Sequence, residues 1–480
     1  MKNLYLMLIA ALVIVSCSDT DALNPVNQTR ISDATAFATP QRVGQLVLGM
    51  YSGVKVGNFY GGRFLNYQDV RGPEFNNERN NGVTNLFTWN FGVQSSTNEV
   101  QNLWSAAYIA INRCNVVIGG LETSPITPEL KTTFTAEARF LRALSYYSLL
   151  TLYAKPYTQD NGASLGVPLR LVAETSGGNN DLVRSSVADV YKQVIDDLNF
   201  AEANLPLTNT TAFNNTTRAH RNTAIALKTR VYLSMGKYPE VVTEANKIVS
   251  ISAPFTATSG VPNAMTPTIQ AAFASAAVTV ENVFSFPYGP NDLQGTQNGL
   301  VHYYNASSVG GSEYSLAPTS ITANTDWKTS DSRRNFNVVL LGKTWLHKWT
   351  KSQSDPDFVP VIRYSEVLLN LSEALARSSN SLDARAIQLL NAVRGRSDAT
   401  TVFTSASFAN VQALLDQIAI ERRIELLGEG FSSPDIMRLK QNFPAKGLAP
   451  SVNTTDTQYL WPIPLNELLY NKLAVQNPGH

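Results

Sequence analysis

The sequence is dominated by segments in which apolar residues recur every three or four positions. The clearest segment begins at Ser186, which forms an S-x-x-D capping box with Asp189, and its apolar stripe consists of Val187, Val190, Val194, Leu198, Ala201 and Leu205. A stripe with the 3.6-residue period of the α-helix gives a helix one face to bury against a neighbour. The spacing therefore predicts a mostly α-helical protein.

Two further helices follow as a pair. One spans residues 224–235 and ends at Gly236, and the next spans 238–249 with Pro239 in its first turn. This helix-turn-helix unit is close in length to a tetratricopeptide repeat. Helices are also predicted at 34–52, 97–119, 129–154, 363–378, 383–396 and 409–428. Their irregular spacing indicates stacked helix pairs without a strict repeat.

Two long segments, 53–95 and 251–361, lack a helical period and are rich in aromatic residues. The first contains Phe59, Tyr60, Phe64, Tyr67, Phe75, Phe87, Trp89 and Phe91, and the second contains Tyr288, Tyr303, Tyr304, Tyr314, Trp327, Trp345 and Trp349. Disordered segments are poor in aromatics, and long ordered loops are usually functional. We therefore interpret both as folded binding loops within one structural unit.

The first residues have the pattern of a lipoprotein signal peptide. Lys2 precedes an apolar run from Leu4 to Val15, which is too short to span a membrane and ends in Ile-Val-Ser before Cys17. This lipobox predicts a signal peptide at 1–16 and lipidation of Cys17. After it we expect a flexible tether at 17–32 and a single domain at 33–480. The alternative is an ordinary signal peptide with a chance cysteine.

Charge and cysteine content exclude several classes of protein. The chain has 38 basic and 37 acidic residues, and removal of Lys2 with the signal peptide leaves the two equal. A neutral chain gives no electrostatic reason to expect nucleic acid as a partner. Cys114 is the one cysteine besides Cys17, so no disulfide is expected within a lipidated chain.

Motifs for catalysis or metal binding are absent from the sequence. The four histidines, at 220, 302, 347 and 480, do not have zinc-site spacing, and neither a G-x-S-x-G elbow nor a phosphate-binding loop is present. Glu421, Glu425 and Glu429 have the spacing of ion pairs along a helix, beside Arg422 and Arg423. Asp355 and Asp357 are interpreted as a polar turn rather than a calcium site. No enzymatic activity, metal or cofactor is predicted.

The first aromatic loop has the composition of a carbohydrate site. Trp and Tyr rings cover the C–H faces of sugars, while acidic and basic side chains bind their hydroxyls. Tyr67, Asp69, Arg71 and Trp89 form the leading candidate set. The alternative is that each aromatic anchors its own loop to the core.

Seven stretches in order along the chain resemble the SusD/RagB family of outer-membrane lipoproteins of Bacteroidota. They are Trp104–Asn115 (WSAAYIAINRCN), Glu137–Leu150 (EARFLRALSYYSLL), Pro360–Arg377 (PVIRYSEVLLNLSEALAR), Leu389–Arg396 (LLNAVRGR), Ile418–Gly430 (IAIERRIELLGEG), Leu460–Glu467 (LWPIPLNE) and Gln476–Gly479 (QNPG). The family's usual EGxRWxDLxR run is altered after Gly430, where this chain has FSSPDIMR, although Asp435 and Arg438 keep their spacing.

The resemblance implies a tetratricopeptide-like superhelical core of helix pairs, with loop-rich excursions and a few short strands. It also implies a non-catalytic protein that is lipid-anchored in the outer membrane, faces the cell exterior, and delivers oligosaccharide to a SusC-like TonB-dependent transporter for uptake. A peptide ligand, as in the RagB branch, is the main alternative; a surface glycoside hydrolase and a pure tetratricopeptide scaffold are the others.

The resemblance also divides the residues into two groups. Tyr303, Tyr304 and Trp327 join the candidate ligand-binding set because they lie on the second excursion. The shared motifs are expected to be scaffold, with helices packed and cross-linked by Trp104, Arg139, Arg142, Arg363, Glu366, Arg422 and Glu425.

Overall fold

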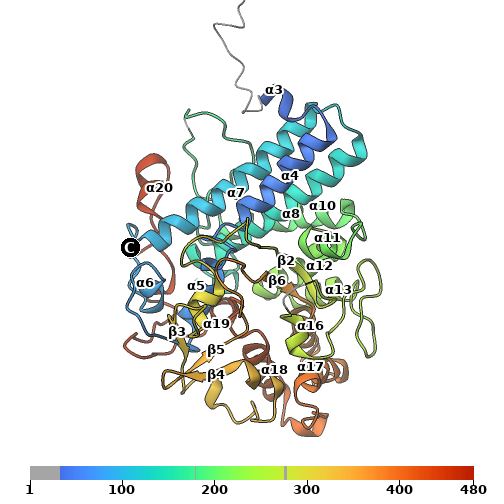
Figure 1. Cartoon of the computed structure of the whole chain (residues 1–480), viewed down its shortest axis with the longest axis vertical. Helices are drawn as coiled ribbons and strands as arrows, with labels where there is room; N and C mark the ends of the chain where they lie inside the picture. Colours follow the sequence, from blue (N-terminus) through green and yellow to red (C-terminus); the bar gives the residue numbers. More distant parts are fainter. Residues whose placement is uncertain (1–32, 179, 275–277) are drawn as a thin grey trace, which may run out of the picture.

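The computed structural model describes residues 33–178, 180–274 and 278–480, and it is built on a stack of helices (Figure 1). The predicted signal peptide, Cys17 and the tether to residue 32 lie outside the described residues. The short helix α3 (Asp33–Ala36) precedes α4 (Pro40–Val54), and α4 packs along the two longest helices, α7 (Asn98–Thr123) and α8 (Pro128–Tyr153).

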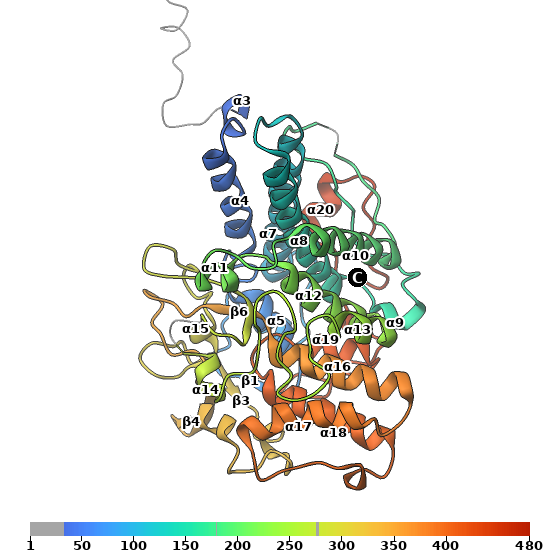
Figure 2. The ribbon, with the colours of Figure 1, turned by 90° about the vertical axis from the view of Figure 1, so that its right-hand side faces the viewer.

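The stack continues through helices that pack in chain order. In succession α8 contacts α10 (Val187–Asn204), α10 contacts α12 (Arg221–Ser234), α12 contacts α13 (Tyr238–Ala245), and α13 contacts α16 (Tyr364–Ser379). The last members, α17 (Ala384–Ser397) and α18 (Val411–Glu425), pack on α16 at the end of the molecule opposite α4 (Figure 2). This arrangement confirms the predicted tetratricopeptide-like core.

Local sequence signals set the helix boundaries. The Ser186 hydroxyl accepts the Asp189 N–H at 3.0 Å, and the apolar stripe of α10 is buried as predicted. Gly236, in the left-handed region at φ +69°, ends the turn after α12, and Pro239 stands in the first turn of α13. Helix α8 is buried nearly all round beyond Ala136, as expected for a central helix.

Charged side chains cross-link the stacked helices. From the centre of α8, Arg142 donates to both oxygens of Asp197 on α10 at 2.8 and 2.7 Å, and to Asn115 on α7 at 2.8 Å. The predicted scaffold residues are buried in the same way, except that Arg139 remains partly exposed with its guanidinium 4.1 Å from the ring centre of Phe200. The family motifs thus serve the core.

The three acids on the α18 segment are ion-paired, but not along their own helix. Glu421, Glu425 and Glu429 are buried and pair with cations from other elements, namely Arg333, Arg394, Arg363, Arg396 and Lys348. The prediction of pairs with Arg422 and Arg423 was wrong, because those two side chains leave α18 towards Asp435 and Glu74. Spacing along one helix cannot show partners that tertiary packing supplies.

The first excursion contains a helix that the sequence did not predict. Helix α5 (Arg63–Arg71) lies in segment 53–95, together with β1 (Phe75–Asn77) and α6 (Leu86–Trp89). All nine residues of α5 are buried, so it has no apolar stripe set against a polar face. Because α5 is buried on all sides and its polar side chains bind other protein groups, its sequence does not show the alternation of apolar and polar faces that predicts a helix.

The second excursion is made of short elements. It contains α14 (Ile269–Ala272), β2 (Asn282–Phe286), α15 (Leu300–Tyr304), β3 (Tyr314–Leu316), η1 (Ile321–Ala323), η2 (Ser332–Phe336), β4 (Asn337–Leu340), β5 (Lys343–Leu346) and β6 (Val359–Arg363). Its strands form antiparallel pairs: β2 with β6 in an irregular register, and β4 with β5 across a tight turn at Leu341–Gly342. Strand β3 pairs with β1, so the two excursions are joined.

The remaining short elements are distributed along the chain. They are α9 (Tyr157–Asp160), α11 (Ala212–Thr217), η3 (Ser405–Ser407), α19 (Ser432–Arg438), η4 (Thr457–Tyr459) and α20 (Leu465–Tyr470).

The final segment returns to the first helices of the stack. Helix α19 packs on α5, the Trp461 N–H donates to the Leu152 carbonyl at 2.8 Å, and the Asn477 amide donates to the Tyr153 carbonyl at 2.8 Å. None of the helices within the described residues is both long and apolar enough to cross a membrane.

Candidate functional site

The seven residues predicted to bind ligand lie in the core rather than on a surface. The exposed fractions of Tyr67, Asp69, Arg71, Trp89, Tyr303, Tyr304 and Trp327 run from 0 to 6%. The Trp89 indole donates to the Phe75 carbonyl at 2.8 Å, and the Trp327 ring lies 4.0 Å below the guanidinium of Arg334. Their burial favours the alternative that such aromatics anchor their own loops to the core, and ligand contact by these residues stays a prediction.

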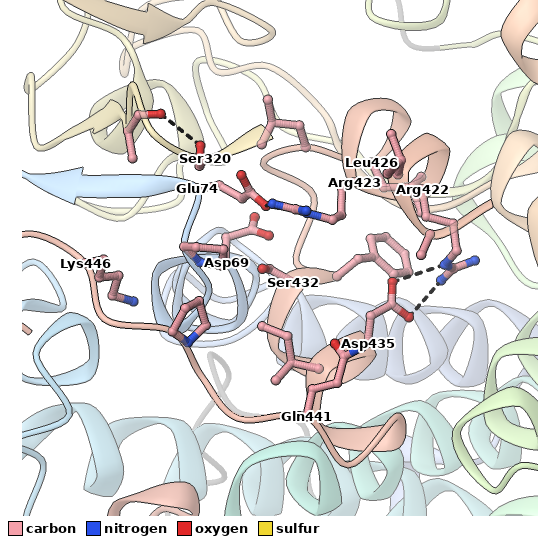
Figure 3. Close-up of a pocket in the computed structure, with 18 of the residues that line it drawn as sticks. Asp69, Glu74, Ser320, Arg422, Arg423, Leu426, Ser432, Asp435, Gln441 and Lys446 are labelled. Carbon is pink, nitrogen blue, oxygen red and sulfur yellow. Dashed lines mark hydrogen bonds and ion pairs between the residues drawn. The ribbon is translucent and has the colours of Figure 1, made fainter. Parts of the chain in front are cut away.

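A cavity of about 640 Å³ lies beside this core, where three distant chain segments meet. Its wall comes from the α5–β1 junction, from the turn before η1, and from α18 through α19 to residue 447 (Figure 3). Asp69 is the one predicted ligand-binding residue among those lining it. The lining also includes Glu74, Asn76, Thr319, Asp416, Arg422, Arg423, Phe431, Ser432, Asp435, Arg438, Gln441 and Lys446.

One ion pair crosses the cavity wall between α18 and the segment before β1. Both Nε and one terminal nitrogen of Arg423 lie 2.8 Å from Oε1 of Glu74. The other oxygen of Glu74 accepts the Ile321 N–H at 3.1 Å, which fixes the carboxylate against η1. Figure 3 shows the two side chains extended towards each other along the wall. Glu74 is buried, whereas 38% of the Arg423 side chain is exposed.

A second charged group joins α18, α19 and α16. Arg422 and Arg438 both contact Asp435, and Arg438 also binds both oxygens of Glu373 at 2.7 Å. Burial acts to raise the pKa of Asp435, but the charges of Arg422 and Arg438 outweigh it and hold the pKa below its ordinary value. The charges of this group are therefore matched inside the protein.

Asp69, on α5, faces the residues that lead into α19. Its Oδ2 accepts the Gly430 N–H at 2.8 Å and the Tyr304 hydroxyl at 3.2 Å. Burial raises the pKa of Asp69 to about 7, since these hydrogen bonds do not fully replace the lost hydration. Gly430 adopts φ +87°, and a Cβ there would stand 3.1 Å from the Cα of Leu65. The glycine thus lets the chain pass close to α5.

Two buried cations bind backbone carbonyls at this side of the cavity, Lys446 in the wall and Arg71 behind it. Lys446 donates to the carbonyls of Val70 and Gly72, and Arg71 donates to the Tyr459 carbonyl at 2.6 Å. Burial lowers the pKa of Arg71 to about 10, and burial followed by the Arg71 charge lowers that of Lys446 well below its ordinary value. Lys446 thus holds its own loop against the end of α5, and Arg71 ties η4 to α5.

Several polar groups on the wall retain hydrogen-bonding capacity. Within the part of the chain that the structure describes, no side-chain hydrogen bond is formed by Asn76, Thr319, Ser432 or Gln441. Together with the terminal nitrogen of Arg423 that does not bind Glu74, they offer amide, hydroxyl and guanidinium groups beside the apolar ring of Phe431. A ligand rich in hydroxyls suits such a wall.

A second cavity, of about 740 Å³, runs along α7 and is also lined by Arg170, Glu174, Ser176, Asn180 and residues of α20. Its polar groups already bind one another: Asn112 exchanges two hydrogen bonds with the backbone of Glu174 at 2.9 and 2.8 Å, and the Trp104 indole donates to Glu467 at 3.3 Å. The first cavity is therefore the better candidate site.

Sequence reasoning missed most of the first cavity. The useful signal was the departure from the family's usual run after Gly430, because Phe431, Ser432, Asp435 and Arg438 all line the wall. Glu74 and Arg423 carried no signal, since the pair joins positions 349 apart in the chain.

No metal centre is formed by the described residues. They contain no group of three or more His, Cys, Asp or Glu side chains placed to hold an ion. The Asp355–Asp357 segment is a polar turn, as interpreted from the sequence, in which Asp357 accepts the N–H groups of Thr350 and Lys351 at 2.9 Å each.

Comparison with family models and known proteins gives matches to SusD-like proteins. Residues 156–480 match the model of the SusD family, and residues 27–233 match a model described as starch-binding associating with outer membrane. The SusD-like protein P2 of Formosa agariphila is 25% identical, with 98% of each chain covered.

The solved structures that this chain resembles are also those of SusD-like proteins. A SusD superfamily protein from Bacteroides fragilis is 30% identical with a TM-score of 0.83, over 92% of this chain and 99% of that one. A laminarin-binding SusD-like protein shares the fold at 20% identity, with a TM-score of 0.73 over 92% of this chain and all of its own. Family model, relatives and fold together show that this chain belongs to the SusD family.

Proposed function

We propose that this protein binds an oligosaccharide at the cell surface, without cleaving it, and delivers it to a SusC-like TonB-dependent transporter in the outer membrane. The observation that carries the binding proposal is the cavity of about 640 Å³ lined by free amide and hydroxyl groups beside Arg423 and Glu74. Hydroxyl-rich ligands need many such donors and acceptors at once. The family description as starch-binding and the laminarin-binding relative support the same ligand class.

Ion pairing at the wall supports binding rather than hydrolysis. Glycoside hydrolases use two carboxyl groups, one of which is protonated to release the leaving group. Glu74 and Asp435 each contact arginine, and the charges of Arg422 and Arg438 hold the pKa of Asp435 below its ordinary value. Asp69 faces the Gly430 N–H and the Tyr304 hydroxyl with the same oxygen. These carboxyl groups suit recognition of hydroxyls.

The anchoring and partner proposals rest on sequence and family. The lipobox at Cys17 supports a lipid anchor, and the family description supports association with the outer membrane. Lipid attached at Cys17 would keep the cavity close to a transporter in the same membrane.

Glycan binding is tested by titrating the purified mature protein with neutral oligosaccharides and with peptides of mixed sequence, monitored by calorimetry. Binding and recovery of an intact oligosaccharide is the expected result. Binding of peptides alone would replace the glycan with the peptide alternative, and appearance of shortened sugars would replace binding with hydrolysis.

The partner proposal is tested by purifying an affinity-tagged full-length chain from detergent-solubilised membranes of the source organism. Recovery of a β-barrel transporter in stoichiometric amount is expected. Recovery of the tagged chain alone under mild detergent would contradict delivery to such a partner.

A further inference from the structure

The charges around the cavity are balanced inside the protein. Arg423 is paired with Glu74, and the Arg422 and Arg438 cations are matched by Asp435 and Glu373. Lys446 is buried and donates to backbone carbonyls instead of facing a ligand. Among the lining residues described, every cationic side chain therefore already has a protein acceptor.

A ligand carboxylate or sulfate would find no unmatched cation on this wall. It would instead approach Glu74, Asp69 and the rim residue Asp416, whose carboxylate accepts from Gln412. An anion brought into a partly buried site without a counter-charge loses hydration that nothing replaces. The wall therefore favours a ligand without charge.

The Arg423–Glu74 pair has the geometry to hold hydroxyl groups. Arg423 uses Nε and one terminal nitrogen for Glu74, which leaves its other terminal nitrogen without a protein partner in the described structure. A guanidinium carries five N–H groups in a fixed plane, so the remaining ones project from a position that Glu74 fixes. Glu74 in turn is fixed by the Ile321 N–H.

We propose that the cavity selects uncharged oligosaccharides and that the Arg423–Glu74 pair is the element that recognises their hydroxyl groups. This inference rests on the proposed function and deepens it, by naming the ligand class and the recognition residues. Arg423 donates to the sugar oxygens, Glu74 holds the guanidinium in place, and the free amides of Asn76 and Gln441 complete the contacts.

The ligand class is tested with matched sugars. The mature protein is titrated with maltohexaose, laminarihexaose, cellohexaose and mannohexaose, and the member that binds most tightly is then oxidised at its primary hydroxyls to uronates. The oxidised sugar is expected to bind at least about tenfold more weakly, and its methyl ester, which restores neutrality, is expected to recover most of the affinity.

Equal or tighter binding of the oxidised sugar would overturn the inference while leaving the proposed function standing. Absence of binding to every glycan, accompanied by binding to peptides, would overturn the proposed function and this inference with it. The two failures are therefore distinguishable within one set of titrations.

The recognition pair is tested with the same sugar and three variants. Arg423→Ala is expected to weaken binding by about tenfold to a hundredfold, because a charge-assisted hydrogen bond is lost. Arg423→Lys, which keeps the charge but not the planar fork, is expected to recover part of the loss at most. Glu74→Gln is expected to weaken binding less than Arg423→Ala, since it loosens the guanidinium without removing it.

Arg218→Ala is the matched control. Arg218 pairs with buried Glu137, its side chain is 27% exposed, and it lies outside the cavity lining. Its loss is expected to leave sugar affinity unchanged. Circular dichroism and thermal unfolding verify that each variant is folded. Folded Arg423→Ala protein with wild-type affinity would overturn the assignment of the recognition pair.

Discussion

The guanidinium of Arg363 lies 2.7 Å from the carboxylate of Glu425, measured from Nη1 to Oε1, although 62 positions separate the two residues. The side chains of Arg363 and Glu425 are exposed by no more than 1%. The same guanidinium also binds Glu281 and Glu429. Strand β6, helix α18 and the residue that precedes β2 are thereby joined through buried charge.

Removal of one member should be costly, because its partners would stay buried and unpaired. Glu425→Ala is expected to lower the free energy of unfolding by about 3–5 kcal/mol, measured by urea denaturation. Burial acts to raise the pKa of Glu425, but Arg396, Arg363 and Arg333 hold it well below the ordinary value. Its contribution is thus present above pH 4.5 and lost as pH falls through the lowered pKa. Asp196→Ala, which removes an exposed pair with Lys192, is the control and should leave the urea midpoint unchanged.

His220 should make the protein sensitive to mild acid. Burial lowers the pKa of His220 from 6.5 to about 4, so the folded state keeps the ring neutral while the unfolded chain takes up a proton. This contribution to stability is complete above pH 6.5 and is lost as pH falls towards 4, by about 3 kcal/mol in total.

The measurement is the free energy of unfolding in urea over this pH range, for wild type and His220→Gln. The variant should lose less stability on acidification than wild type. Asp69 acts in the opposite sense, because its raised pKa favours the protonated folded state at low pH, so the difference between the two proteins is the decisive quantity. Parallel curves would contradict the assignment to His220.

Two glycine substitutions should have opposite effects. Gly430→Ala places a Cβ near the Leu65 backbone at φ +87°, which should lower stability by about 1–3 kcal/mol and weaken ligand binding through Asp69 and α19. Gly119→Ala adds a methyl group in open space on α7 and should raise stability by about 0.5–1 kcal/mol. Thermal unfolding of both variants is the measurement, and a shift in the same direction for both would refute the steric explanation.

Cys17→Ser should abolish lipid attachment and remove the protein from the outer membrane if Cys17 carries the lipid. The precursor would then lack the thiol that accepts diacylglycerol, so cleavage after Ser16 should also fail. Labelling with radioactive palmitate and fractionation of cells are the measurements. Cys114→Ser is the control, because that buried thiol lies within α7 and should not affect anchoring.

Most of the helical core could be predicted from the sequence, because amphipathic helices and their caps are local features. Ser186, Gly236 and Pro239 marked boundaries that the structure confirms. The single helix predicted at 34–52 is two helices in the structure, α3 and α4. Thr39 caps the second one, which begins at Pro40, and the Thr39 hydroxyl accepts the Arg42 N–H at 3.3 Å. That Thr-Pro signal was present in the sequence.

The cavity could not be predicted in the same way. Exposure of an aromatic depends on what packs over it, so the composition of residues 67–89 could not separate a binding surface from a loop anchor. The pairing of Glu74 with Arg423 depends on the packing of β1 against η1 and α18, which no local spacing encodes. Asp69 was chosen from the composition of the first loop, and among the predicted residues it alone lines the cavity within the described structure.

The return of the final segment to α8 has a consequence for unfolding. In an open helical array each repeat contacts only its neighbours, so that unfolding can begin at the terminal repeats. Here the Trp461 and Asn477 bonds to the end of α8, and the packing of α19 on α5, tie late parts of the chain to early ones. With its ends fastened in this way, the superhelix should melt in one cooperative step, and amide hydrogen exchange should be as slow in α8 as in α16.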